Sequence, residues 1–522
     1  MTKQKKNFGC LKIILIGFVC VLAVPLTWLA FNNGPLASDG NPLADVSPET
    51  TWITEPLDHN GDVDYLEALN LRLSEGIASE NNAAVLYTRA FGPCDLDEKT
   101  FTRYLKRVGI DGSQIHDLPL VDFDEWFVRK QREQQVEPLT SSDASEDEDP
   151  LEQYRYLTGD AALWSAEQFP LVDERLNEFS DVAKTIRDAT KIEQCYFPLI
   201  ARYKPQVMSA LLPHPQKMRH AARYFSISAL RHLHDNDFDN FIDDLQCMDQ
   251  IAQHTAQGAT LVEELISIAV KRMILSRVLT ACDLGLSTDD LKTLLAFSRT
   301  IKPLEDGVSR IDNCERFMAL DAAISIGRGE SEMGFTYPQA FVDWNETLRV
   351  INDERDLLVE KLDVEDFTSR AAGSAEIWNR LEQMERNSSV EFMATTLMGR
   401  KSKARWMGKL LTTILTPAFD QVLSAEASLK SDIEMAQIAI AISIYRNEKG
   451  ELPDSIQQLA PEFLEAIPVE DATGKPYTMS KTDTGTGFRV QSATWIEGAE
   501  EAGLEIMIAP SATSFEQFLQ DR

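Results

Sequence analysis

Apolar residues recur at helical spacing through most of the central part of the chain. Three successive segments show this pattern and predict helices over residues 217–234, 239–254 and 260–280. In the first segment Met218 and Phe225 lie on one apolar stripe, whereas the third segment is apolar around most of its circumference. We therefore expect the third helix to be buried on most sides. The short connections between the three segments predict antiparallel neighbours.

Further helical patterns fill much of the remaining chain, and several have recognisable ends. Gly285 is expected to end one helix and Ser287 to cap the next, because two aspartates follow it in the first turn. Ser79 and Asp343 are expected to cap two other helices. The predicted helices span residues 63–74, residue 79 to the Gly92-Pro93 pair, and residues 309–326, 342–362, 374–398 and 402–415.

The C-terminal part of the chain combines one long helix with short strands. Residues 419–446 carry an apolar seam close to a heptad, which predicts a single helix. Three short runs with alternating polarity follow later, PYTMS, GFRVQSA and LEIMIAP, and they predict a small antiparallel sheet. Gly485 and Gly487 are expected to form the hairpin turn between the first two strands.

Between the long helix and these strands lies a stretch rich in Gly and Pro, GELPDSIQQLAPEFLEAIPVEDATGKPY. Gly450 is expected to end the helix in a left-handed conformation. Ile456 and Leu459 are expected to face the long helix, and Gly474 to turn the chain into the first strand. The prolines of this stretch are conformationally rigid, so they reduce the entropy lost when a region with little core becomes ordered.

Together the patterns predict a mainly α protein with a small C-terminal α+β module. The expected organisation is a cytoplasmic tip with a transmembrane anchor over residues 1–31, a tether over 32–56, an N-terminal helical region over 57–132, an acidic loop over 133–150, a helical body over 151–417 and a C-terminal helix with its sheet over 418–522.

The N-terminal segment has the features of a membrane anchor. Four lysines lie before or next to an apolar run over residues 13–31, which is long enough to cross a bilayer core of about 30 Å. The lysines favour a cytoplasmic N-terminus, so we expect a single-pass protein of the cell membrane with most of the chain outside. A cleaved signal peptide is the alternative, although Ala30, Phe31 and Asn32 fit a cleavage site poorly.

The chain is strongly acidic, with a formal net charge of −32, and its 43% hydrophobic residues are typical of a folded protein. The four lysines are the only charged side chains in residues 1–31, so the remainder is more acidic still. Nucleic acid and anionic lipid headgroups are expected to be repelled. Solubility explains such a surface in most proteins, and cation binding or a basic partner is the alternative.

Five of the seven cysteines lie beyond the anchor, and none belongs to a C-x-x-C motif. Because five is an odd number, at least one thiol is free or pairs between chains. Buried free cysteine is the expected state for most of them, and a disulfide between two of them is the alternative in an oxidising compartment. The five residues are Cys94, Cys195, Cys247, Cys282 and Cys314.

No motif of a catalytic or cofactor site occurs: the chain has no P-loop, no G-x-G-x-x-G after a strand, no G-x-S-x-G and no H-E-x-x-H. We therefore predict no catalytic, cofactor-binding or metal-ligating residue, and we expect the histidines at the surface. The acidic phrase DHNGDVD, from Asp58 to Asp64, lacks the glycine and glutamate positions of a calcium loop. It is interpreted as a turn that caps the next helix.

The phrase ERFMALD places Glu315, Arg316 and Asp321 beside an apolar helical stripe. A partly buried ion pair with another helix is the expected role, and a polar functional pocket is the alternative. In the similar phrase FVDWNETLRVINDERD, Trp344 is expected to dock in the core.

Several longer phrases resemble a known family. LDHNGDVDYLEALN, ENNAAVLYTRAFGP, WSAEQFPLVDERL and DWNETLRVINDERD are similar to segments of signal-anchored, helix-rich envelope proteins of planctomycete-type bacteria. The likeness is broad and loose, spanning about residues 52–495, and it implies no activity and no site residues.

The tail separately resembles the C-terminal segment of type II secretion pseudopilin-like proteins. It departs from that pattern at VEDATG, where the expected Asp-Pro is missing, and its membrane segment lies far upstream instead of at the start of the long helix. The position of the membrane segment argues against a pilus subunit. The residues that match are Gly450, Pro453, Ile456, Leu459, Pro468, Gly474, Pro476 and Tyr477.

The function expected from the sequence is that of a membrane-anchored, extracytoplasmic structural or interaction protein of the cell envelope. The alternatives are a secretion or pseudopilin-associated component and, third, an envelope hydrolase. The expected partners are the membrane, through the N-terminal helix, and envelope proteins, but not nucleic acid. The sequence leaves the oligomeric state open.

Overall fold

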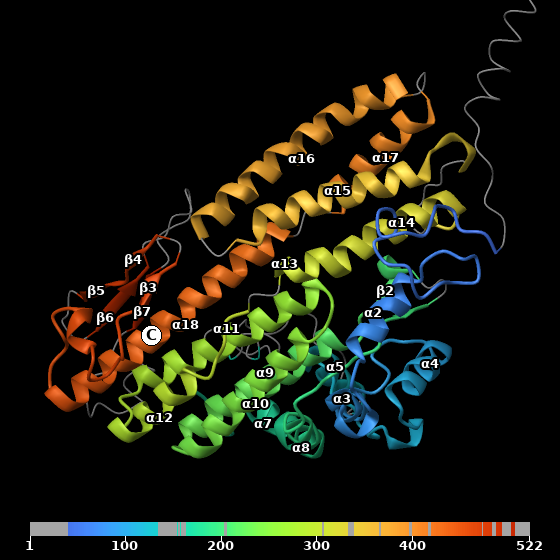
Figure 1. Cartoon of the computed structure of the whole chain (residues 1–522). Helices are drawn as coiled ribbons and strands as arrows, with labels where there is room; N and C mark the ends of the chain where they lie inside the picture. Colours follow the sequence, from blue (N-terminus) through green and yellow to red (C-terminus); the bar gives the residue numbers. More distant parts are fainter. Residues whose placement is uncertain are drawn as a thin grey trace, which may run out of the picture.

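The computed structural model describes residues 40–133, 154, 157, 163–202, 206–304, 307–331, 339–364, 367–395, 399–415, 419–471, 473–482, 487–492 and 503–506. Within them the protein is mainly helical with a small antiparallel sheet near its C-terminal end, as the sequence predicts (Figure 1). The predicted anchor and the acidic loop after residue 133 lie outside these residues and stay predictions. No helix in the described ranges is both long and apolar enough to cross a membrane.

The helices follow one another with short connections. They are α2 (Tyr65–Leu73), α3 (Ala83–Phe91), α4 (Glu98–Val108), α5 (Phe123–Glu133), α7 (Pro170–Glu178), α8 (Ser180–Ala189), α9 (His214–His234), α10 (Phe238–Ala256), α11 (Leu261–Asp283), α12 (Thr288–Ser298), α13 (Gly307–Arg310), a π-helical turn (Ile311–Glu315), α14 (Arg316–Arg328), α15 (Trp344–Leu362), α16 (Phe367–Thr395), α17 (Arg400–Ile414) and α18 (Phe419–Lys449).

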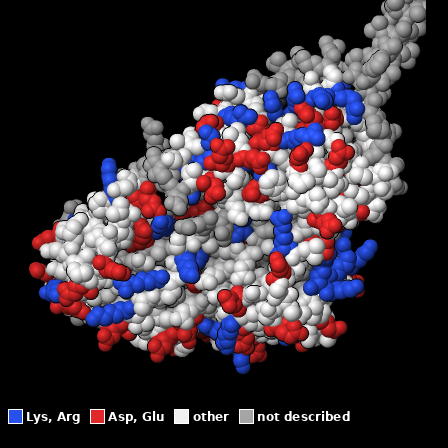
Figure 2. All heavy atoms as spheres, viewed as in Figure 1, with Lys and Arg blue, Asp and Glu red and all other residues white. Residues whose placement is uncertain are grey.

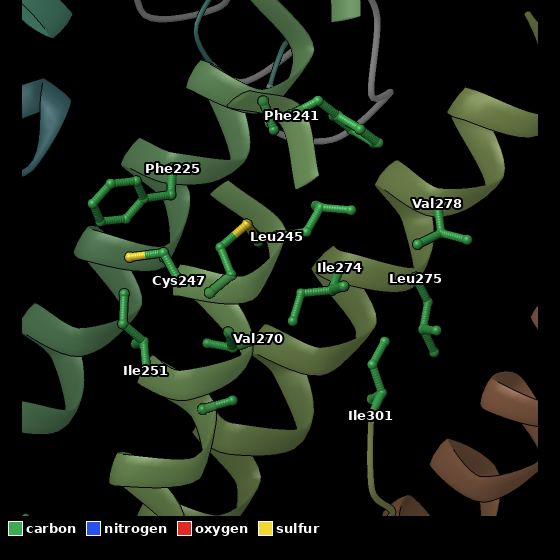
Figure 3. Close-up of a cluster of buried hydrophobic side chains, with 14 of the residues drawn as sticks. Phe225, Phe241, Leu245, Cys247, Ile251, Val270, Ile274, Leu275, Val278 and Ile301 are labelled. Atoms are coloured by element: carbon green, nitrogen blue, oxygen red, sulfur yellow. The ribbon is translucent and has the colours of Figure 1, made fainter. Parts of the chain in front are cut away.

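The largest hydrophobic core extends from α3, α4, α5, α7 and α8 through α9, α10, α11 and α12 to the C-terminal part of α18 and the C-terminal sheet. Figure 3 shows part of it, with Phe225 of α9, Leu245 of α10 and Ile274 of α11 among the buried side chains. Helix α11 is buried on most sides, as predicted. Even Lys271 is only 1% exposed, and its buried ammonium group donates to Asp249 Oδ1 at 2.9 Å. A charged side chain in such a core requires a partner of this kind.

A second core joins α2, α14, α15 and α17 through residues such as Phe317, Leu348 and Met407. A smaller cluster connects the two halves of the molecule, because Val422 of α18 packs there with Leu358 of α15. In Figure 1 α14, α15, α16 and α17 form the upper half of the molecule, and α18 runs from them toward the sheet.

Helix α18 differs from the sequence prediction in how much of its surface is buried. Ile440 belongs to the predicted seam and is buried, but Ile438, Ala439, Ala441 and Ile442 are buried as well. A single seam was expected, whereas helices α11 and α12 cover one side of α18 and the sheet covers another. The helix therefore belongs to the core of the helical body as much as to the C-terminal module.

The C-terminal sheet has the strand order β5-β6-β7 and is antiparallel throughout. Phe488 and Val490 of its central strand are fully buried, as expected from the alternation in GFRVQSA. Two further strand pairs, β1-β2 and β3-β4, were not predicted because each strand has only two residues. The strands are β1 (Ile200–Ala201), β2 (Ala210–Leu211), β3 (Val469–Glu470), β4 (Lys475–Pro476), β5 (Thr478–Lys481), β6 (Phe488–Gln491) and β7 (Gly503–Ile506).

The Gly and Pro stretch before the sheet adopts the predicted turns. Gly450 ends α18 with φ +79°, and Gly474 has φ +63° in the turn between β3 and β4. Ile456 and Leu459 are buried in a short 3₁₀ helix that packs against α18. The predicted hairpin turn at Gly485 lies outside the described residues, although the N–H of Thr482 donates to the carbonyl of Gly487 at 2.9 Å.

The segment before α2 packs against the helical body, although the sequence predicted a tether up to residue 56. Thr50 and Thr51 are buried, and their carbonyl oxygens accept hydrogen bonds from Asn352 Nδ2 and Tyr65 Oη, each at 2.9 Å. Polar side chains buried elsewhere in the fold therefore hold this segment. Such distant partners cannot be recognised in a local stretch rich in Pro, Gly, Asn and Ser.

Most predicted helix caps are confirmed. Ser287 Oγ accepts from the N–H of Asp290, and Asp343 Oδ1 accepts from the N–H of Glu346. The prediction for Ser79 is wrong, because this residue begins a separate 3₁₀ turn. The cap of α3 is Asn82, whose side-chain oxygen also accepts from the N–H of Tyr196, 114 residues away.

Candidate functional site

An open cleft lies between α2, α4 and strand β1, with a volume of about 540 Å³. One wall is basic, the floor is apolar and the opposite wall carries two carboxylates. The volume lies in the range of pockets that enclose a whole ligand, about 300–1,000 Å³. The lining residues are Asp64, Leu66, Glu67, Arg103, Lys106, Arg107, Leu199, Ile200 and Ala201.

The basic wall follows from the pattern of α4, EKTFTRYLKRV. Tyr104 and Leu105 are buried, so the cations Lys99, Arg103 and Lys106 share the exposed face at i, i+4 and i+7. The helix starts at the cap Asp97, whose side chain accepts from Thr100 N at 3.0 Å, and ends at Gly109 in the left-handed conformation. Figure 2 shows lysine and arginine side chains gathered where Figure 1 places α4.

The floor is fixed by a buried asparagine of α2. Asn70 donates to the carbonyl of Leu199 at 3.0 Å, and its side-chain oxygen accepts from the N–H of Leu199 and from Tyr196 Oη, each at 2.8 Å. This places the start of β1, at Ile200, beside α2 and α4. Leu199 and Ile200 line the cleft but are each at most 5% exposed, so most of their apolar surface packs inside the protein.

Some charged side chains of the cleft already have a partner of opposite charge, and others do not. Glu67 pairs with Arg107 at 2.5 Å, and Asp64 accepts from the N–H of Glu67 at 2.9 Å as the cap of α2. Arg103 donates to the carbonyl of Ala201 at 2.7 Å, and it forms no ion pair with a carboxylate in the part of the chain that the structure describes.

Lys106 forms no ion pair with any residue that the structure describes. Together with Arg103 it leaves two positive charges without a counterion in the cleft. An anionic group is therefore the chemically matched ligand for this wall.

The residues of ERFMALD do not reach this cleft. Arg316 is 1% exposed and pairs with Asp312 at 2.5 Å and with Asp356 of α15 at 2.7 Å, which confirms the predicted ion pair with another helix. Its guanidinium also lies 3.9 Å from the ring centre of Trp52. Asp321 instead accepts from the N–H of Val207 at 2.9 Å, and burial raises its pKa to about 7.

The prediction of surface histidines is wrong for three of them. His214, His220 and His254 are at most 8% exposed, because each finds a polar partner inside the protein. His214 Nε2 lies 2.7 Å from Glu263 Oε1, and Tyr87 Oη lies 2.9 Å from His254 Nδ1. Burial lowers the pKa of His254 to about 4.

The acidic phrase at Asp58 forms a turn, as expected. Asp58 Oδ1 accepts from the N–H groups of Asn60 and Asp62, and Asp64 caps α2. Asp62 is paired with Arg328 at 2.6 Å. Among the residues that the structure describes, no three His, Cys, Asp or Glu side chains are grouped as metal ligands would be.

The five cysteines beyond the predicted anchor are free thiols, as expected for most of them, and all except the half-buried Cys94 are buried.

The cleft between α2 and α4 was not predicted from the sequence. The basic stripe in EKTFTRYLKRV was a readable signal, because its cations recur at helical spacing. The floor of the cleft could not be predicted, because it forms through contacts between α2 and residues far along the chain.

Comparisons of this chain with protein family models, with curated proteins and with solved structures found no match in any of the three.

Proposed function

We propose that the protein is an interaction protein of the cell envelope that binds an anionic partner in the cleft between α2 and α4. The observation that carries the proposal is the pair of cations, Arg103 and Lys106, that line the cleft beside apolar residues and have no carboxylate partner among the residues that the structure describes. Both cations are exposed, so a partner can approach them without displacing an existing ion pair.

The overall charge strengthens this assignment. A chain with a net charge of −32 repels anions over most of its surface, so a cleft with unpaired cations stands out electrostatically. Each exposed charge contact is worth only about 0.2–1 kcal/mol. Useful affinity therefore needs several such contacts together with burial of apolar surface, and the cleft provides both.

The envelope location rests on the sequence. The lysines before the apolar run at residues 13–31 support an N-terminal anchor with the cleft on the extracytoplasmic side. Protease added to intact spheroplasts should then cleave most of the chain. Full protection of the chain would contradict this part of the proposal.

A secretion-associated component is the second candidate. It is supported by the order of elements in the tail, where the long helix α18 is followed by the antiparallel strands β5, β6 and β7. The motif residues around Gly450 that resemble pseudopilin-like segments lie at this helix-to-sheet transition. Crosslinking in native membranes should then recover components of a secretion assembly.

The binding proposal is tested with the full chain in a neutral detergent and a fluorescent glutamate oligomer. The wild type should bind it with an affinity that falls as salt is added. Replacing Arg103 and Lys106 by Glu should reduce the affinity at least tenfold. Lys184→Glu is the matched control, because Lys184 is an exposed lysine of α8 outside the cleft. Equal binding by all three proteins would overturn the proposal.

A further inference from the structure

Resting on this proposed function, we infer that the natural occupant of the cleft is an extended acidic peptide segment whose carboxylates alternate with apolar side chains. The geometry of the cations, the character of the floor and the position of the acidic wall each favour this class over a compact anion such as phosphate.

The cations of α4 form a row and do not converge on one point. Arg103 and Lys106 line the cleft, and Lys99 continues their row beyond it along the helix axis; a rise of about 1.5 Å per residue spreads the three over about 10 Å. A compact anion is held by donors that surround it, often at a helix N-terminus. Here the first turn of α4 is occupied by its own cap, since Asp97 accepts from both the N–H and the hydroxyl of Thr100.

The floor adds a requirement that a hydrated inorganic ion does not meet. Leu66, Leu199 and Ile200 line the cleft beside the cations, so part of its lining is apolar. In an extended strand successive side chains point to opposite sides, and every second residue lies about 7 Å farther along. Alternating glutamates can therefore face α4 while the residues between them cover the floor.

The acidic wall restricts how densely the ligand can be charged. Glu67 already neutralises Arg107, and Asp64 lies at the same wall. A ligand with closely spaced negative charges would be repelled by these carboxylates, whereas single charges spaced along a peptide can align with Arg103 and Lys106. Charge spacing, rather than total charge, then determines selectivity.

The experiment compares two peptides of identical composition on the full chain in neutral detergent. One alternates four glutamates with four valines, and the other has the four glutamates followed by the four valines. Both carry the same Gly-Ser flanks and the same fluorophore. The alternating peptide should bind at least tenfold more tightly, and millimolar inorganic phosphate at constant ionic strength should not displace it.

Two variants connect the result to the cleft. Lys106→Gln should weaken binding of both peptides, because it removes a charge at an exposed position. Ile200→Ala should weaken only the alternating peptide, because it removes part of the floor. A thermal melt followed by circular dichroism checks that the Ile200→Ala variant is folded. If that variant does not fold, the Lys106→Gln variant still tests whether the peptides bind in the cleft, because Lys106 is exposed.

The outcomes separate this inference from the proposed function. Equal affinity for the two peptides, lost in Lys106→Gln, overturns the alternating-peptide inference and leaves an anion-binding cleft. Displacement by phosphate also overturns it in favour of a compact anion. Binding of neither peptide, or binding that Lys106→Gln does not weaken, overturns the inference. If the glutamate oligomer also fails to bind the wild-type protein, the proposed function is overturned as well.

Discussion

The carboxyl group of Glu426 in α18 lies beside that of Glu264 in α11 in the interior of the protein, at 6% and 0% exposure. Two neighbouring buried carboxylates repel each other unless one of them carries a proton. Burial, together with the neighbouring Glu264, raises the pKa of Glu426 to about 9. The N–H of Gly307 donates to Glu426 Oε1 at 3.0 Å, and Arg310 Nε lies 2.8 Å from Glu264 Oε2.

This pair predicts a pH dependence of stability. The folded chain keeps the proton up to about pH 9, whereas unfolding returns Glu426 toward its ordinary pKa of 4.5. Wild-type stability should therefore fall as the pH rises between these values, by up to about 1.4 kcal/mol per pH unit. Glu426→Gln cannot titrate, so its stability relative to wild type should increase from pH 5.5 to pH 8.5.

Urea unfolding of both proteins at the two pH values measures this difference. Glu376→Gln is the control, because that carboxylate is exposed on α16 and paired with Lys361 at the surface. An identical pH slope for wild type and Glu426→Gln would show that the pair does not hold a proton.

Arg316→Lys should destabilise the protein by about 2–4 kcal/mol. A lysine cannot reach Asp312 and Asp356 together while stacking on Trp52, so a buried charge loses partners. Thermal unfolding measures the loss. Arg386→Lys is the control, since its pair with Glu382 is exposed and should contribute less than about 1 kcal/mol. Equal losses of stability in the two variants would contradict the conclusion that the buried contacts of Arg316 stabilise the fold.

Gly450→Ala should cost about 1–2 kcal/mol, because a residue with a Cβ is strained at φ +79°. A Cβ at this position would meet no atom within 4 Å, so the cost comes from the backbone conformation alone. Faster proteolysis after residue 450 and a lower melting temperature are the expected results. Gly112→Ala, which also has room for a Cβ but needs no left-handed conformation, should change both values little.

Counting thiols tests the state of the cysteines. Burial raises the pKa values of Cys94, Cys247 and Cys282 to about 12, so a thiol reagent should label them slowly in the folded protein. After unfolding in guanidinium without reductant, every cysteine beyond the predicted anchor should react. If some react only after a reductant is added, a disulfide is present.

The helices and their ends were largely predictable because they depend on neighbours in the sequence. Ser287 and Asp343 cap their helices through N–H groups three residues away, so a short stretch contains the whole interaction. The failure at Ser79 shows the limit of this reasoning. Asn82 became the cap of α3 because its side chain also binds Tyr196, a partner that no local pattern reveals.

The candidate site shows the same division. The basic stripe of α4 is visible in the sequence, since Arg103 and Lys106 follow from the helical period. Whether those cations are neutralised was not predictable. Arg107 is paired with Glu67 while Lys106 is not, and this difference depends on how α2 lies against α4.

The sequence by itself determined the mainly helical class, most helix bounds, the helix-to-sheet tail and an acidic surface, because periodicity, capping and net charge are local or summed properties. Only the tertiary structure decided that residues 50 and 51 are buried, that α18 is covered on several sides, and that Glu264 and Glu426 lie next to each other in the interior. The physical reason is that burial and pairing depend on residues far apart in the chain, and folding alone brings these together.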